Sequence, residues 1–183
     1  ERGENSPSRI LMQRTLAAMF DWHNYGHSII GARADVENVD IPRLQAFYRQ
    51  YYQPDNATLI VSGKFNPAQV LAWVAGSFGQ IAKPTRKLPK LYTIEAAQDG
   101  ERTVTLRRVG GTPQLMASYH GVPGAHPDQA AAELLTLVMG DTPAGRLHKR
   151  LTETNLAAQT SAYTPTLHDP GAMSFAASLA PGQ

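Results

Sequence analysis

Residues 51–67 (YYQPDNATLIVSGKFNP) constrain the fold more than any other stretch, because they hold a complete series of local structural signals. Pro54 cannot continue a helix, and the Asp-Asn pair after it favours a turn. The apolar run within 57–62 contains β-branched residues and predicts a short buried strand. Asn66 followed by Pro67 is an N-cap with proline at the first helical position. The stretch therefore predicts a helix, a turn, a strand and a second helix, in that order.

Similar signals along the rest of the chain predict an α+β fold with antiparallel-rich sheets flanked by helices. Helices are predicted where a capping residue precedes apolar positions at helical spacing, at 7–20, 40–51, 67–78, 128–139 and 141–151. Strands are predicted at 57–62, 103–107, 114–120, 160–165 and 172–179, with a hairpin turn at 168–171 joining the last two. Residues 80–98 are rich in proline and basic residues and are interpreted as a linker. It separates a first lobe at 1–79 from a second at 99–183.

Composition excludes several classes of function. The 183 residues include 17 Lys and Arg against 15 Asp and Glu, and a net charge of +2 is too small to predict a nucleic-acid partner. There is no cysteine, which excludes disulfides, thiolate metal sites and a catalytic thiol. No apolar run reaches membrane-spanning length. The absence of an initiating Met suggests an internal segment of a longer protein.

Histidine spacing predicts no catalytic or metal site. His23 and His27 have the i, i+4 spacing of a helical zinc pair. The residues between them include Asn24 and Gly26, which form helix poorly, and no Glu lies there to act as a base. Neither H-x-x-E-H nor H-E-x-x-H occurs in the chain. We therefore assign no catalytic residue and no metal ligand, and leave the substrate-binding residues unknown.

Several short motifs, taken in order, resemble the insulinase/pitrilysin-type zinc metallopeptidases, the inverzincin class with H-x-x-E-H, in their bacterial form. They cover nearly the whole chain: ENSP at 4–7, HNYGHSIIG at 23–31, VENV at 36–39, LQAFY at 44–48, YYQPDN at 51–56, RLHKRL at 146–151 and HDPG at 168–171. The resemblance implies an internal fragment of such a protein. Residues 1–79 would be the C-terminal part of the peptidase-like catalytic domain. Residues 99–183 would be the N-terminal part of the following, homologous domain without zinc.

The resemblance also implies where the zinc chemistry of the parent protein lies. In this family a helix carries H-x-x-E-H, whose two histidines bind Zn²⁺ while the glutamate activates the metal-bound water. A third ligand, a glutamate, follows tens of residues later. The order of the motifs places that ligand before Glu1, so neither Glu1 nor Glu4 is assigned to zinc. Their charges suit the N-terminus of the helix predicted at 7–20. Zinc is expected in the parent and not in this fragment.

Many family members also carry an Arg and a Tyr that hold the substrate carbonyl, in the segment after the S-R-L helix. The matching positions here are Thr152 and Ala158, which supply neither a guanidinium nor a phenol. The expected function is therefore a fragment of a zinc endopeptidase that hydrolyses peptides in a two-half chamber. The alternative is a non-catalytic scaffold or assembly subunit of the same family. A stand-alone α+β binding module is a third reading.

Partners and location follow from the same resemblance. Peptide substrates are expected for the parent, together with a homo- or hetero-oligomer formed with a family member. Bacterial relatives are often exported, which favours a periplasmic or exported location. Two half-domains would leave sheet edges or apolar faces uncovered, so the chain is expected to self-associate.

Overall fold

The structure of the protein is a computed structural model that describes residues 6–180 and Gly182. Packing within the chain divides it into two compact units. Unit 1 consists of Glu1–Ile30 and Thr93–Gln183, and unit 2 of Gly31–Tyr92. The lobes predicted at 1–79 and 99–183 stay a prediction, because they rest on likeness to longer proteins and not on packing within this chain.

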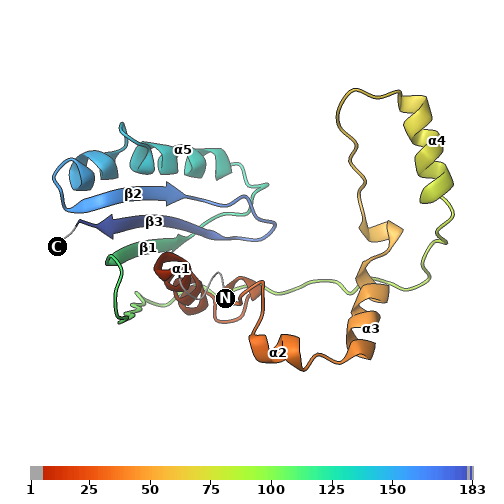
Figure 1. The fold of residues 1–183 in the computed structure, drawn as a ribbon, viewed down its shortest axis with the longest axis horizontal. Helices are drawn as coiled ribbons and strands as arrows, with labels where there is room; N and C mark the ends of the chain where they lie inside the picture. The colour runs from red at the N-terminus through yellow and green to blue at the C-terminus, as the bar shows by residue number, and fades with distance from the viewer. Residues whose placement is uncertain (1–5, 181, 183) are drawn as a thin grey trace. The chain divides into compact units, whose positions relative to one another are not determined.

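Unit 1 is built on a three-stranded antiparallel sheet with the strand order β1-β3-β2 (Figure 1). The strands are β1 (Gln114–His120), β2 (Ala157–Tyr163) and β3 (Ala172–Leu179), close to three of the predicted strands. The register places Ser174 of the central strand between Ser118 and Tyr163. The hydroxyls of the two serines lie 2.8 Å apart and share a hydrogen bond. Helices with an antiparallel sheet confirm the predicted α+β class.

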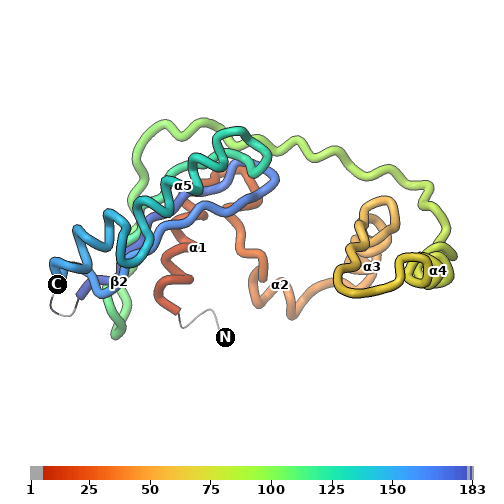
Figure 2. Tube along the Cα trace, turned by 90° about the horizontal axis from the view of Figure 1, so that it is seen from above, coloured from red at the N-terminus to blue at the C-terminus, as the bar shows by residue number. Residues whose placement is uncertain are grey.

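Two helices, α1 (Pro7–Met19) and α5 (Gln129–Gly140), lie against the sheet (Figure 2). The Tyr163 hydroxyl donates a hydrogen bond to the Sδ atom of Met12 in α1, at 3.4 Å. At the end of α5, Gly140 packs so closely on Ala162 that an added Cβ would overlap its backbone. Neighbouring residues of a strand point to opposite faces. Tyr163 contacts α1 and its neighbour Ala162 contacts α5, so the two helices cover opposite faces of the sheet.

The buried core of unit 1 lies where α1 ends against the sheet. Met19, Phe20 and Ala172 are buried there, and Leu16 and Tyr25 pack around them. The rings of Phe20 and Tyr25 meet edge to face with centroids 5.8 Å apart, a favourable aromatic geometry. This core fixes the place at which the chain leaves α1.

Unit 2 holds three helices, α2 (Arg33–Glu37), α3 (Ile41–Tyr51) and α4 (Pro67–Ser77), with a 3-10 turn at Pro54–Asn56. The side chain of Asn66 accepts a hydrogen bond from the Gln69 amide at 3.3 Å, which confirms the predicted cap of α4. The Arg86 guanidinium holds the Asp55 carboxylate with two hydrogen bonds of 2.6 and 2.9 Å. Helix α2 lies in a stretch where the sequence predicts no helix.

Two of the predicted strands are wrong: residues 57–62 and 103–107 are in no strand. A strand forms only when its backbone N–H and C=O groups meet those of a neighbour, and no described residues supply that neighbour. The side chain of Ile60, expected inside a sheet, is 82% exposed. The apolar pattern at 57–62 is therefore real, but no sheet forms around it.

The helix predicted at 141–151 is wrong in its extent. Regular helix begins only at Arg146 and passes into a π-helical turn, η3 (His148–Thr152). Among residues 6–180, no helix combines the length and apolarity needed to cross a bilayer.

Candidate functional site

The segment that follows α1 is held by the carboxylate of Glu95. Three consecutive backbone amides donate to it: that of Asp21 to Oε1 at 2.9 Å, and those of Trp22 and His23 to Oε2 at 3.0 and 2.7 Å. Burial opposes ionisation, but the three N–H donors outweigh it and lower the pKa of Glu95. Glu95 lies in the linker predicted at 80–98, so part of that linker is held by hydrogen bonds to the segment after α1.

The Arg102 guanidinium completes this anchor at the end of α1. It donates to both carboxylate oxygens of Asp21, at 2.8 and 2.6 Å, and to the carbonyl oxygen of Ala18 at 2.6 Å. The hydrogen bonds to Asp21 raise the pKa of Arg102. A cation that binds the last carbonyls of a helix also matches the negative end of its dipole.

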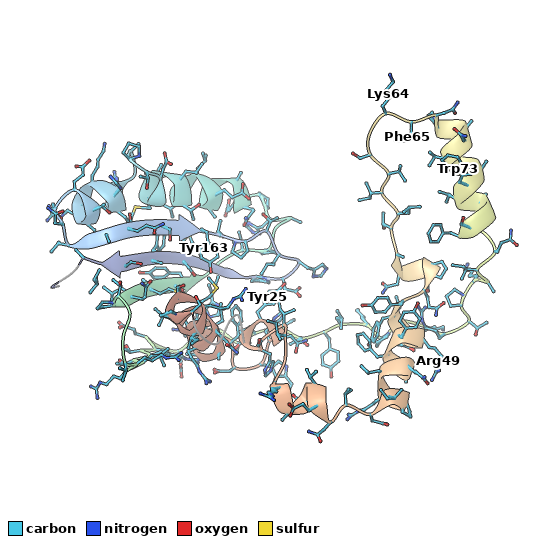
Figure 3. The ribbon with its side chains drawn as sticks, in the orientation of Figure 1. Tyr25, Arg49, Lys64, Phe65, Trp73 and Tyr163 are labelled. Atoms are coloured by element: carbon cyan, nitrogen blue, oxygen red, sulfur yellow. The ribbon has the colours of Figure 1, made fainter. Side chains whose placement is uncertain are left out.

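His23 links the same segment to the turn between β2 and β3. Its Nδ1 accepts a hydrogen bond from the Tyr25 amide at 3.2 Å, so in the neutral ring the proton must be on Nε2. That Nε2–H faces Oδ2 of Asp169 at 3.3 Å. The Tyr25 hydroxyl, labelled in Figure 3, accepts from the Asp169 amide at 3.2 Å. The hydrogen bond from His168 and that from His23 together lower the pKa of Asp169 despite its burial.

We call Glu95, Arg102, His23, Tyr25 and Asp169 the anchor cluster. The His23 ring in this cluster offers no free nitrogen, because both ring nitrogens are occupied and the side chain is only 8% exposed. A general base needs a nitrogen or oxygen that can reach the proton it removes. The arrangement therefore holds together three chain segments that are far apart in the sequence.

The structure does not bring the histidines together into a metal site. His23 lies in the anchor cluster, His120 packs edge-on against Phe20 at 5.0 Å, and His126 accepts from the Asp128 amide at 3.1 Å. In the part of the chain that is described, no group of three or more His, Asp and Glu could hold a metal ion. Glu1 and Glu4 lie outside the described residues.

The two positions that match the Arg/Tyr pair of the family are also placed. Thr152 ends η3, and its Oγ1 is buried with no hydrogen-bond partner among the described residues. Ala158 is an exposed residue of β2. Sequence reasoning considered His23 only as a metal ligand and missed the anchor cluster, because the contacts of His23 with Glu95 and Asp169 span 72 and 146 positions.

Comparison with known proteins decides the family. The model of the peptidase M16 inactive domain matches residues 38–183, most of the chain. The chain belongs to the M16 peptidase family. This confirms the resemblance to the insulinase-type zinc metallopeptidases, of which the chain carries the part without the zinc motif.

Relatives of this M16 chain are longer proteins. The zinc protease PqqE of Helicobacter pylori is 29% identical over 179 residues, which cover 96% of the chain and 40% of PqqE. The crystal structure of a protease from Helicobacter pylori has a TM-score of 0.91 at 28% identity, over 99% of the chain and 45% of that protein. The periplasmic protease PqqL of Escherichia coli shares the fold, with a TM-score of 0.68 at 20% identity over 97% of the chain and 20% of PqqL. The chain thus spans about two fifths of its curated relative.

Proposed function

We propose that the chain is the part of an M16 zinc endopeptidase that joins the peptidase-like domain to the inactive domain, and that it does no chemistry by itself. The observation that carries this proposal is the match of residues 38–183 to the M16 inactive domain. The absence of H-x-x-E-H from all 183 residues supports it. The name of the related PqqE, a zinc protease, supports an active parent protein.

The role proposed for this chain's own residues is positional. The anchor cluster holds the segment after α1 against the β2–β3 turn and against Glu95. Such contacts keep these chain segments in one arrangement, so no ordering cost arises there when a substrate binds the parent protein. The described residues do not fit a zinc site, because they bring no three ligands together. No metal step is therefore assigned to them.

The test uses the whole chain. It is purified with zinc present, dialysed, and assayed for metal by elemental analysis and for cleavage of an unstructured fluorogenic peptide with and without chelator. We expect far less than one zinc per chain and no chelator-sensitive cleavage. Stoichiometric zinc, or cleavage that a chelator abolishes, would overturn the assignment of the chemistry to another part of the protein.

A non-catalytic scaffold is the second candidate. Thr152 and Ala158, in place of the Arg and Tyr that hold the substrate, favour it. The longer protein separates the two candidates, because only the peptidase must carry H-x-x-E-H upstream and lose activity on chelation.

The remaining parts of the proposal concern the substrates, the partner and the location of the parent protein. Peptides are the proposed substrates of the parent, and a second M16 subunit its proposed partner. A periplasmic or exported location is supported by the likeness in fold to periplasmic PqqL. Fractionation of cells that produce the full-length protein with a tag tests the location, and recovery in the cytosol alone would contradict it.

A further inference from the structure

The Asp99–Gly100 pair lies between two members of the anchor cluster. Among the 15 glycines of the chain, Gly100 is the only one that follows an Asp or an Asn. Glu95 precedes this pair and Arg102 follows it, and both are hydrogen-bonded to the segment around the end of α1. Residues 91–108 are in no helix or strand. A chemical change at this pair would therefore alter a stretch of chain between two anchored points.

Neither of the two groups that would react at this pair is held in place. The Asp99 side chain is 94% exposed, and Nη2 of Arg102 is 3.9 Å from its Oδ1, too far for a hydrogen bond. An exposed ion pair of this kind restrains a carboxylate little. The side chain of Gln98 donates to the carbonyl oxygen of Gly100, but the Gly100 backbone amide donates no hydrogen bond to any described residue. No atom lies within 4 Å of the place that a Cβ of Gly100 would occupy.

Other aspartates lack this combination of features. The carboxylate of Asp55 is held by two hydrogen bonds from Arg86. Asp169 precedes Pro170, which has no backbone N–H. Asp99 is thus set apart by a free carboxyl group beside a free and unhindered backbone amide.

We propose that Asp99 is a site of spontaneous isomerisation to isoaspartate, and that this change weakens the anchor cluster. The amide nitrogen of Gly100 attacks Cγ of the protonated Asp99 carboxyl group. An N–Cγ bond forms, the Cγ–OH bond breaks, and the amide hydrogen and the hydroxyl leave as water. Water then opens the resulting succinimide ring: attack at Cγ restores aspartate, and attack at the main-chain carbonyl of Asp99 gives isoaspartate. The water released in the first step balances the water consumed in the second, so no oxidant or cofactor is needed.

The product differs from the original chain in two respects that concern the anchor cluster. The main chain between Glu95 and Arg102 gains one carbon atom, because Cβ of Asp99 becomes part of it. The carboxylate moves onto Cα of Asp99 and so shifts relative to the Arg102 guanidinium. Since the chain bends at Gly100, an added main-chain atom there redirects the segment that leads to Arg102. The isomerised chain should therefore hold the end of α1 less firmly. This inference concerns the ageing of the chain and does not rest on the proposed function.

The first test measures the reaction in the whole chain. The protein is kept at neutral pH and body temperature and digested with trypsin at intervals. Electron-transfer fragmentation then locates isoaspartate in the peptide 91–102, whose only aspartate is Asp99. A synthetic peptide of the same sequence is aged alongside. We expect isoaspartate to accumulate in the chain about as fast as in the free peptide. A rate far below that of the peptide would show that the fold protects the pair, and would overturn the proposal.

Two variants test the route of the reaction. Asp99→Glu should abolish it, because the longer side chain would need a larger ring that closes much more slowly, while the negative charge is kept. Gly100→Ala should slow it several-fold, because the methyl group hinders the approach of the amide, and the open space at this position lets the fold accommodate that group. Equal rates in Gly100→Ala and wild type would contradict attack by this amide.

The second test measures the effect on the anchor cluster. The isomerised chain is separated from the unmodified chain by ion-exchange chromatography, and both are unfolded in urea with Trp22 fluorescence as the signal in a Trp73→Phe background. The isomerised chain should unfold at a lower urea concentration. An aged Asp99→Glu chain should keep the midpoint of its fresh form, which controls for other damage. An isomerised chain with the midpoint of the unmodified chain would overturn the proposed link to the anchor cluster.

Discussion

The substitution Glu95→Gln tests the anchor cluster at its most connected residue. The carboxylate accepts one amide at Oε1 and two at Oε2. Glutamine has one acceptor oxygen, so its best orientation keeps the amides of Trp22 and His23 and turns an NH₂ group toward the amide of Asp21. One hydrogen bond is lost and two become neutral.

The magnitude follows from these three bonds. A hydrogen bond to a charged group contributes about 1.5–3 kcal/mol and a neutral one about 0.5–1.5 kcal/mol. Because Glu95 is only partly buried, solvent reduces these values, and we expect a loss of about 2 kcal/mol in the free energy of unfolding of unit 1. With a urea slope of about 2 kcal/mol/M, the midpoint should fall by about 1 M.

Tryptophan fluorescence can report this loss locally. The chain has two tryptophans, and Trp22 lies in the anchored segment. In a Trp73→Phe background, urea unfolding followed by fluorescence therefore monitors unit 1. The matched control is Glu101→Gln, an exposed glutamate with no hydrogen bond or ion pair among the described residues. If Glu95→Gln and Glu101→Gln had the same midpoint, the anchoring role of Glu95 would be refuted.

The same variant predicts a pH dependence. The folded state lowers the pKa of Glu95 below its ordinary value of 4.5, so its stabilisation is present above that pH. It is lost as the pH falls through the lower folded value, where the carboxylate takes up a proton. The difference in stability between wild type and Glu95→Gln should be constant near neutral pH and shrink below about pH 4.5. A difference that grew in acid would contradict this sign.

Three further predictions concern other contacts. Gly140→Ala should destabilise unit 1 by about 1–3 kcal/mol in urea unfolding, because the new methyl overlaps the backbone of Ala162, and an unchanged midpoint would disprove the close packing. His168→Ala should raise the pKa of Asp169 in an NMR titration by removing its main hydrogen bond, and an unmoved pKa would show that His168 does not contribute. Thr152→Val should leave stability unchanged or raise it by about 1 kcal/mol, because a buried hydroxyl without a partner is removed, and a clear loss would reveal a partner for that hydroxyl.

Features that depend on a few neighbouring residues were predictable from the sequence. The cap of α4 by Asn66 is one, because capping residue, proline and apolar positions lie within a single turn. Helix α5 and the hairpin of β2 and β3 are others. The family was equally accessible, because its motifs are short and their order along the chain is characteristic.

Features that depend on distant partners were not predictable. Residues 57–62 have the composition of a strand, but composition does not provide the neighbouring strand. The anchor cluster could not be predicted for the same reason, because the backbone amides that donate to Glu95 lie 72 to 74 positions away in the sequence.

The bonds that Glu95 makes have a consequence for how the chain can be cut and rejoined. The polypeptide leaves unit 1 after Ile30 and re-enters it at Thr93. Soon after re-entry, Glu95 accepts hydrogen bonds from the backbone amides of Asp21, Trp22 and His23, which lie shortly before the point where the chain leaves. Unit 2 is thus an insertion whose two ends are fastened within its host. A short flexible bridge in place of residues 31–92 should close the gap without disturbing the sheet, so that unit 1 becomes a module that can be grafted, permuted or studied without its insert.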